Sequence, residues 1–345
     1  MRRLIPLILL LAALALPVAA QAAQSPPQAQ PAAEKPPDGD SYFQQILPKL
    51  RAAQTPAERF ELCKDFVTKF PEHKYSAYLL DGAREACVEM KKLPEFLPLA
   101  EAVLAAAKSP DAQRGVKSVL VEAYADMGQT DKVKALSGEV LGAPDANFGN
   151  FQTLLPILAK AGLWTEVLSA AGKAEPLTTP ENVQKDAPNR QFTPADLKRR
   201  SDSRKGFLLT YRGWARANTG DAAGALADFQ AADPFITRNF VGTSYDPLDL
   251  YWGKALLLAG QFDAAIERLA RPALFGGDPE YKTVLKDAYL KKGGAEADFE
   301  AYLEGQRPKY AKAMADFTLP DYAGKEFNFA STKGKVVLLA FWFPT

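Results

Sequence analysis

Few residues of this chain have the side chains that redox, metal or nucleophilic chemistry requires. There are two cysteines, Cys63 and Cys87, and one histidine, His73. The cysteines are too far apart in the sequence to form a C-x-x-C pair, so they are not expected to act as a redox dithiol. A single histidine supplies neither a histidine-based triad nor a histidine-rich metal site. The sequence therefore predicts no catalytic residue, no metal site and no cofactor within its length.

The two cysteines could instead form a structural disulfide. Both lie in segments with a helical pattern, on either side of a turn predicted at residues 70–73. Antiparallel pairing about this turn places Asp81, and not Cys87, opposite Cys63. Six residues of helix span about 9 Å, which exceeds the Cα separation of about 7 Å that a disulfide tolerates. An offset between the helices would allow the bridge, so a disulfide and two free buried thiols both stay open.

The elements that must position these residues are helices. Apolar residues recur with helical spacing over about residues 42–315, for example at positions 60, 63, 67 and 70. Thr55 and Thr193 each precede a proline and have the features of an N-cap before a first-turn proline. We therefore predict a mainly α fold.

A repeat with a shift of 40 residues is present within this region. Gly213, Gly220, Ala225 and Phe229 align with Gly253, Gly260, Ala265 and Leu269. A small residue lets two helices pack closely, and a glycine turn between them reverses the chain; Gly128 and Gly162 are further predicted turns. The pattern resembles a divergent tetratricopeptide repeat, with a spacing longer than the usual one of about 34 residues. The resemblance implies a TPR-like solenoid of about five or six helical hairpins over residues 41–315, and an irregular α bundle is the alternative.

Two long loops interrupt this pattern, at residues 174–193 and 233–247. The second loop and the residues that follow it are rich in aromatic side chains and arginine: Phe235, Arg238, Phe240, Tyr245, Tyr251 and Trp252. Such residues either anchor a bound peptide or fill the gap between two hairpins. A basic cluster follows the first loop, and we predict it to be a solvated helix face: Lys198, Arg199, Arg200, Arg204 and Lys205.

The N-terminus has the features of a signal peptide over residues 1–22. Arg2 and Arg3 precede an apolar stretch at residues 4–16, which is shorter than a membrane-spanning helix requires, and Ala20-Gln21-Ala22 fits a cleavage site. An uncleaved anchor is the alternative. Removal of residues 1–22 changes a formal charge of +1, from 42 basic and 41 acidic residues, to 40 − 41 = −1. We expect a periplasmic or secreted protein without a membrane span after cleavage and without nucleic-acid partners. A proline-rich linker follows at residues 23–40.

The composition changes at Asp316. A turn is predicted at Gly324-Lys325, a short strand at residues 327–329, and a strand buried on both faces at residues 336–343. A strand of that last kind needs partner strands and covering helices, so residues 316–345 are expected to be the first part of an α/β domain.

This segment resembles the start of the TlpA-like redoxin branch of the thioredoxin superfamily, which is related to the AhpC/TSA peroxiredoxins. The residues that carry the resemblance are Asp316, Phe317, Leu319, Gly324, Lys325, Gly334, Lys335, Phe341 and Trp342. In the family a Cys-x-x-Cys pair follows directly, and here it would come just after Thr345, so no catalytic residue is assigned to this sequence. We expect a longer gene product, in which a selenocysteine codon was misread as a stop; a frameshift, a nonsense mutation or a fragment is the alternative.

The resemblance implies an exported thiol–disulfide oxidoreductase whose helical repeats bind protein or peptide substrates and whose active site meets a redox partner protein. A non-catalytic helical-repeat scaffold is the first alternative. A peroxiredoxin-like peroxidase is the second. Residues 1–345 alone are expected to lack the redox activity.

Overall fold

The computed structural model describes residues 38–244, 246–310, 316–335 and 337. The predicted signal peptide at residues 1–22 lies outside the described residues. Residues 23–37 of the predicted linker also lie outside the described residues. The first helix begins at Gly39, one residue before the linker was expected to end at residue 40. Within the described residues, no helix is both long and apolar enough to cross a lipid bilayer.

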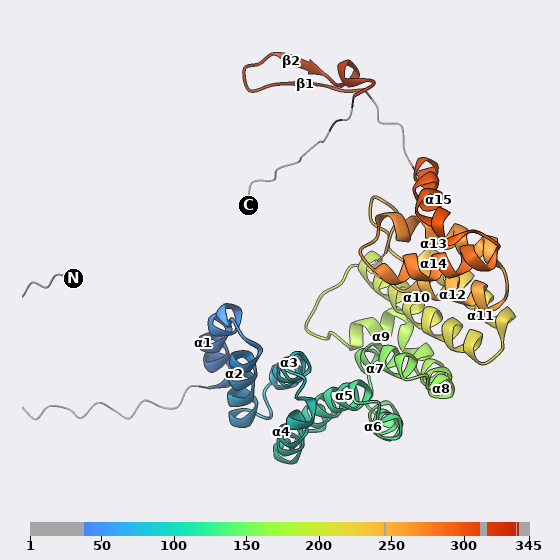
Figure 1. The fold of residues 1–345 in the computed structure, drawn as a ribbon. Helices are drawn as coiled ribbons and strands as arrows, with labels where there is room; N and C mark the ends of the chain where they lie inside the picture. Colours follow the sequence, from blue (N-terminus) through green and yellow to red (C-terminus); the bar gives the residue numbers. More distant parts are fainter. Residues whose placement is uncertain (1–37, 245, 311–315, 336, 338–345) are drawn as a thin grey trace, which may run out of the picture.

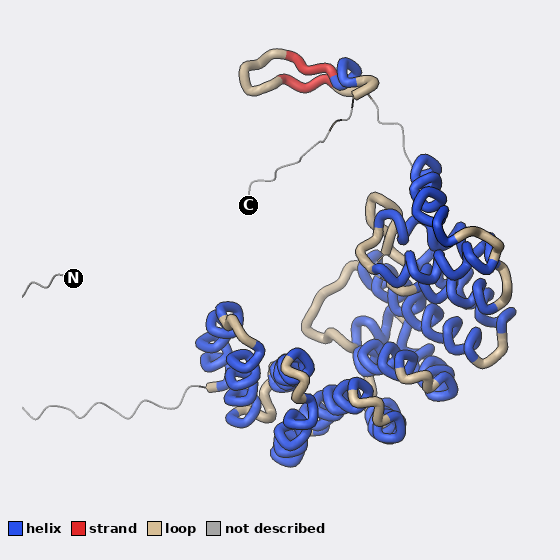
Figure 2. Tube along the Cα trace, in the orientation of Figure 1, coloured by secondary structure: helices blue, strands red, loops and turns tan. Residues whose placement is uncertain are grey.

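The described chain is mainly helical, as predicted, with strands only near its C-terminus (Figure 2). The α-helices are α1 (Gly39–Ala52), α2 (Pro56–Lys69), α3 (Ser76–Glu89), α4 (Leu93–Ala106), α5 (Pro110–Asp126), α6 (Thr130–Gly142), α7 (Phe148–Lys160), α8 (Trp164–Ala174), α9 (Pro180–Lys185), α10 (Pro194–Asn218), α11 (Ala222–Ala232), α12 (Leu248–Leu258), α13 (Phe262–Phe275), α14 (Pro279–Lys291) and α15 (Phe299–Gln306). Short 3₁₀ helices are η1 (Glu175–Thr178), η2 (Asp233–Phe235), η3 (Glu296–Asp298), η4 (Arg307–Tyr310) and η5 (Phe329–Thr332), and the strands are β1 (Thr318–Pro320) and β2 (Glu326–Asn328).

The helices pack as successive antiparallel pairs along an arc (Figure 1). The pairs are α3–α4, α5–α6, α7–α8, α10–α11 and α12–α13, and the first helix of each pair contacts the first helix of the next, through to α14. This is the arrangement of a solenoid, in which each hairpin is covered by its neighbours. This arrangement confirms the predicted helical-repeat fold. The alternative, an irregular bundle, is not observed in the described chain.

The glycines of the predicted repeat have the same roles in both copies. A Cβ atom on Gly213 would lie 2.8 Å from the Phe229 ring, and one on Gly253 would lie 2.5 Å from the Leu269 side chain. Gly220 and Gly260 adopt φ values of +89° and +70° in the turns that follow, a conformation that glycine adopts at no steric cost. The 40-residue shift therefore corresponds to a repeated three-dimensional contact.

The predicted helix starts are also observed. The hydroxyl of Thr55 accepts a hydrogen bond of 3.2 Å from the Glu58 amide, and that of Thr193 accepts one of 3.1 Å from the Asp196 amide. Each cap satisfies an amide that has no partner within the helix, and such a cap contributes about 1 kcal/mol.

One buried charge cluster joins three successive hairpins. Arg84 on α3 is 9% exposed. Its guanidinium pairs with Asp81 at 2.7 Å, with Glu122 on α5 at 2.9 Å and with Asp126 at 2.5 Å. Lys160 on α7 completes the cluster, 3.2 Å from Asp126. Burial raises the pKa of Glu122 to about 7, helped by the neighbouring Asp81 and Asp126 and opposed by Arg84. Glu122 is thus a titratable contact between repeats.

The first predicted loop differs from expectation. Residues 174–193 were expected to lack secondary structure, but they contain η1 and the short helix α9, and only residues 186–193 connect α9 to α10 without a helix. Asn182 explains part of this order, because its amide donates 2.9 Å to the Pro176 carbonyl while its backbone amide donates 3.3 Å to Thr179. The polar residues that suggested a loop therefore make local hydrogen bonds.

The C-terminal segment forms an antiparallel β hairpin. Leu319 pairs with Phe327, and the amide of Gly324 donates 2.9 Å to the Asp321 carbonyl in the connecting turn. The predicted turn and short strand are confirmed, whereas strand β1 was not predicted. The strand expected at residues 336–343 lies outside the described residues except for position 337. In Figure 1 the hairpin lies apart from the helices, and both its strands are exposed.

Candidate binding site

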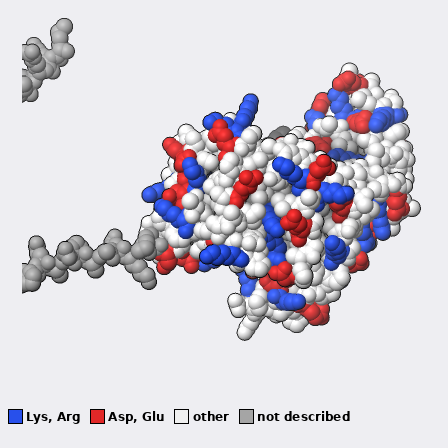
Figure 3. Space-filling view, turned by 90° about the horizontal axis from the view of Figure 1, so that it is seen from below, with Lys and Arg blue, Asp and Glu red and all other residues white. Residues whose placement is uncertain are grey.

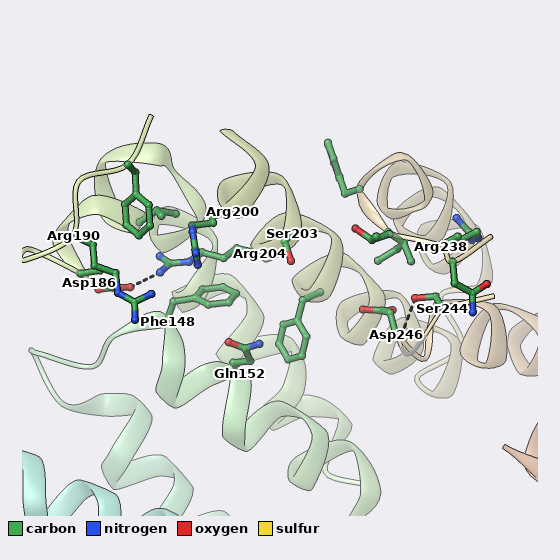
Figure 4. Close-up of a pocket in the computed structure, with 18 of the residues that line it drawn as sticks. Phe148, Gln152, Asp186, Arg190, Arg200, Ser203, Arg204, Arg238, Ser244 and Asp246 are labelled. Carbon is green, nitrogen blue, oxygen red and sulfur yellow. Dashed lines mark hydrogen bonds and ion pairs between the residues drawn. The ribbon is translucent and has the colours of Figure 1, made fainter. Parts of the chain in front are cut away.

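A cavity of about 650 Å³ forms where the two interrupting loops meet (Figure 4). It is bounded by the start of α7, the segment from α9 to α10, the first half of α10, and the segment that leads from η2 to α12. Residues about 60 positions apart in the sequence, such as Val183 and Thr243, line the same space. The irregular parts of the chain are thus brought together at one place.

Three arginines gather on one side of this cavity (Figure 4). Arg204 is held in place, because its guanidinium pairs with Asp186 at 2.8 Å, donates 2.8 Å to the Leu177 carbonyl and lies 4.8 Å from the centre of the Phe148 ring. The guanidinium carbon of Arg200 lies 4.6 Å from the centre of the Phe192 ring. Arg190 and Arg200 are both exposed. Arg204 therefore has a structural role, whereas the other two arginines face the open part of the cavity.

The opposite side carries a fourth arginine whose charge is neutralised. Arg238 pairs with Asp233 at 2.6 Å and with Asp249 at 3.0 Å, and Asp249 is 5% exposed. Burial lowers the pKa of Arg238, but the two carboxylates outweigh this effect and raise it overall. The carboxylate of Asp246 also has a partner within the chain, since it accepts a hydrogen bond of 2.9 Å from the Leu248 amide. Burial raises the pKa of Asp246.

Aromatic rings form an apolar part of the cavity wall and continue into the helical core. Phe148 meets Phe207 edge-on at 6.1 Å, and Phe207 contacts Tyr211 at 4.8 Å. The series continues through Tyr251, which stacks on Trp214 at 5.2 Å. Rings held by neighbouring rings give a rigid apolar surface.

The structure divides the predicted basic cluster. Lys198 and Arg199 are about three-quarters exposed and pair with acids of their own helix, Asp202 and Asp196. These two residues, like Lys205, do not line the cavity, in agreement with the predicted solvated face. Arg200 lines the cavity and is exposed, so the predicted solvated face includes it. For Arg204 the prediction was wrong, because its side chain is 16% exposed and pairs with Asp186. Arg204 lies on a different face of α10 from Lys198, owing to the helical periodicity.

The aromatic residues of the second loop are divided in the same way. Phe235 and Arg238 line the cavity. Tyr251 and Trp252 belong to the helical core, where Trp252 stacks on the Phe229 ring at 5.9 Å. Phe240 is 93% exposed, and Tyr245 lies outside the described residues. Tyr251 and Trp252 therefore fill space between helices, and peptide binding by Phe235 and Arg238 stays a prediction.

The lining residues that were not singled out from the sequence include Phe148, Arg190, Phe192 and Phe207. Arg190 and Phe192 belong to the first predicted loop, and their proximity to an unusually long interruption was the signal available. Phe148 and Phe207 sit in helices whose apolar pattern has the same appearance whether a ring faces the core or a cavity.

A second cavity, of about 940 Å³, lies among α12, α13 and α15. Two of its cations have acidic partners within the chain. Arg268 pairs with Asp249 at 2.9 Å and lies 3.7 Å from the centre of the Trp252 ring, and Lys292 pairs with Asp263. Arg271 also lines this cavity and forms no ion pair with the described residues. Its guanidinium carbon lies 4.7 Å from the centre of the Tyr310 ring, and its Nε is buried without a hydrogen-bond partner.

Cys63 and Cys87 are both buried and free, so the disulfide that the sequence left open is not formed. Cys63 lies against Gly82, whose Cβ position would be 3.2 Å from the sulfur, next to the residue that antiparallel pairing predicted. Burial raises the pKa of Cys63 to about 12. His73 lies 3.3 Å from Asp40, and no group of histidine, cysteine and acidic residues in the described ranges could hold a metal ion.

The residues that resemble a redoxin domain lie in or next to the C-terminal hairpin. Phe317 stacks on Phe329 at 4.8 Å, and Asp316 pairs with Lys333 at 3.1 Å. Leu319 is in β1, and Gly324 and Gly334 adopt φ values of +75° and +82°. Lys325 and Lys335 are at the turn and after η5. Phe341 and Trp342 lie outside the described residues.

Comparisons with known proteins provide little further information. No protein-family model matches the chain, and no curated protein matches it. One solved structure that is similar is a tetratricopeptide repeat protein from Parabacteroides merdae ATCC 43184. It is 14% identical, covers 72% of this chain and 98% of its own, and has a TM-score of 0.33. The site must therefore be interpreted from its own geometry.

Proposed function

We propose that the helical-repeat region is a protein-binding scaffold that holds a partner at the cavity between the two interrupting loops. The observation that carries this proposal is the convergence of both loops and α10 on one cavity. Aromatic rings line this cavity together with two arginines that form no ion pair with the described residues. Aromatic residues and arginine are the types that dominate protein–protein interfaces. Stacked hairpins expose extended surfaces, and long loops in such arrays are often functional.

Site-specific photo-cross-linking tests this proposal. A benzophenone amino acid is placed at Ser203, which lines the cavity and is exposed, and at the exposed Glu101 on α4 as a matched control. We expect discrete cross-linked proteins, identified by mass spectrometry, at Ser203 and not at Glu101. The same products at both positions, or none at Ser203, would contradict a binding role for the cavity.

We further propose that the protein is exported, on the basis of the signal-peptide features of residues 1–22. N-terminal sequencing of the mature protein should then begin at residue 23. A mature protein that retains Met1 and stays in the cytoplasm would refute export.

A second candidate function is thiol–disulfide exchange. The observation that favours it is that Asp316, Gly324 and Gly334 occupy a hairpin and turns in the order in which the redoxin family uses them. In that chemistry a thiolate attacks a substrate disulfide and releases one substrate thiolate, and a second cysteine resolves the mixed disulfide and releases the other. The helical region would then bring protein substrates to the redox domain.

Insulin reduction by a protein that carries the whole redoxin-like domain tests this second function, and peroxide turnover separates it from a peroxidase. Activity should be unchanged in a Cys63→Ser, Cys87→Ser variant, because burial leaves these thiols unreactive. Loss of activity in that variant would mean that the chemistry lies in the helical region instead.

A further inference from the structure

We propose that the cavity binds an acidic peptide, in which carboxylates on both sides of one apolar side chain are recognised by Arg190 and Arg200. This inference rests on the proposed scaffold function and names the chemistry of its partner. Four arginines line the cavity, and two of them have acidic partners: Arg204 pairs with Asp186, and Arg238 pairs with Asp233 and Asp249.

The other two arginines lie at the open side of the cavity. Neither Arg190 nor Arg200 forms an ion pair with any residue in the described part of the chain, whereas the neighbouring Arg199 pairs with Asp196 at 2.8 Å. Arg200 lies over the Phe192 ring, with 4.6 Å from its guanidinium carbon to the ring centre. Stacking covers one face of the guanidinium and leaves its N–H edge available for a carboxylate.

The remaining charged groups of the cavity are occupied. Arg204 is paired with Asp186, and Arg238 with Asp233 and Asp249. The polar side chains of the neighbouring loop hydrogen-bond to each other. The Asn239 side chain accepts a hydrogen bond of 3.0 Å from the Thr243 amide and donates one of 2.8 Å to the Thr243 hydroxyl. These groups shape the wall, so the recognition of charge falls to the two open arginines.

The apolar part of the lining fits a single apolar side chain between the two carboxylates. Phe148, Phe207, Phe235 and Ile236 all line the cavity, and none of them is exposed. A volume of about 650 Å³ is of the size of small-ligand pockets, which are about 300–1,000 Å³, and holds a few residues of an extended chain. Phe207 is fixed by its contact with Tyr211 at 4.8 Å, so the apolar surface is present before a ligand arrives.

The charge distribution favours a peptide over a nucleic acid. On the face shown in Figure 3, basic and acidic side chains alternate over the described residues, and no continuous basic stripe is seen there. Nucleic-acid binding depends on many phosphate contacts spread along a basic surface. Two open arginines next to an apolar wall fit a short acidic segment instead.

Fluorescence anisotropy with a labelled peptide that has two glutamates on each side of one phenylalanine tests the inference. Arg190→Gln and Arg200→Gln should each weaken binding about tenfold, the effect of losing one charge-assisted hydrogen-bonded contact. Arg51→Gln is the matched control, because Arg51 is exposed, lacks an ion pair with the described residues and lies on α1, outside the cavity. Its binding should equal that of the wild type.

The same peptide with glutamines in place of its glutamates should bind at least tenfold more weakly, and added salt should reduce the difference between the two peptides. Both arginines are exposed, so the variants are expected to keep the wild-type circular dichroism spectrum and thermal midpoint. Equal binding of the two peptides, or no effect of either arginine variant, would overturn the inference. If cross-linking at Ser203 succeeds in that case, the scaffold function stands and only the acidic partner is wrong; if cross-linking also fails, both are wrong.

Discussion

Glu122 is expected to reduce the stability of the fold as the pH rises towards neutrality. In the folded chain its pKa is about 7, because the side chain is buried beside Asp81 and Asp126, whereas its ordinary value is 4.5. Between these two values the folded state binds a proton that the unfolded state has lost. The free energy of unfolding therefore falls as the pH rises through this window and stays lower above it.

The size of the effect follows from the two pKa values. Their difference corresponds to about 3 kcal/mol, at about 1.4 kcal/mol for each pH unit. The Glu122 side chain is 26% exposed, and solvent screening at such a site reduces the figure to about 2 kcal/mol. Replacing Glu122 with glutamine keeps the shape and removes the charge, while Arg84 retains its pairs with Asp81 at 2.7 Å and Asp126 at 2.5 Å.

We therefore expect Glu122→Gln to be more stable than the wild type at pH 8 by about 2 kcal/mol and equally stable at pH 4.5. Urea unfolding followed by circular dichroism at a series of pH values measures this difference. Glu139→Gln on α6 is the control, since that carboxylate is 58% exposed, and the variant should differ from the wild type by less than about 1 kcal/mol at pH 8. A Glu122→Gln variant that is less stable than the wild type at pH 8 would refute the reasoning, because it would show that the ionised carboxylate stabilises the cluster.

Three further predictions concern packing, buried charge and the thiols. Gly253→Ala places a Cβ about 2.5 Å from Leu269 and should destabilise by about 1–3 kcal/mol in urea unfolding. Gly172→Ala, with nothing within 4 Å, should instead stabilise by about 0.5–1 kcal/mol. A Gly253→Ala variant at least as stable as the wild type would contradict the close helix contact. Asp228→Asn should cost about 2–4 kcal/mol by the same measurement, because this 4% exposed carboxylate pairs with two arginines at 2.7 and 2.8 Å, and an unchanged midpoint would show that solvent replaces those pairs. Cys63 and Cys87 should react with a maleimide only on unfolding, since both are buried; fast labelling of the native protein, measured by mass spectrometry, would mean that α2 and α3 separate readily.

The sequence predicted the regular part of the fold well, since each signal depends on local chemistry. The N-caps at Thr55 and Thr193 bond to an amide three residues further along the chain. The turns at Gly220 and Gly260 depend on the φ values of the glycines themselves. The 40-residue shift was informative because Gly213 and Gly253 make the same contact in two hairpins. A repeated pattern of small and large residues has few packing solutions, so it indicates the solenoid.

The candidate site could be predicted only in part. The two loops were identified as unusual, but nothing in the sequence shows that residues 186–192 and 235–246 meet. The difference between Arg199 and Arg200 was not predicted either, since one pairs with Asp196 and the other lies over a ring of the preceding loop. That distinction depends on the path of a segment from another part of the chain.

These two outcomes have one physical cause. In a repeat array the residues that recur are those that seal one hairpin against the next, as Phe229 and Leu269 do, and they are buried for that purpose. A residue committed to this packing has no free surface for a partner. The proposed recognition therefore falls to residues outside the repeated contacts, such as Arg190 and Phe235 in the interrupting segments and Arg200 near the start of α10. The regular sequence therefore indicates the scaffold, and its interruptions indicate the place where we propose that it binds a partner.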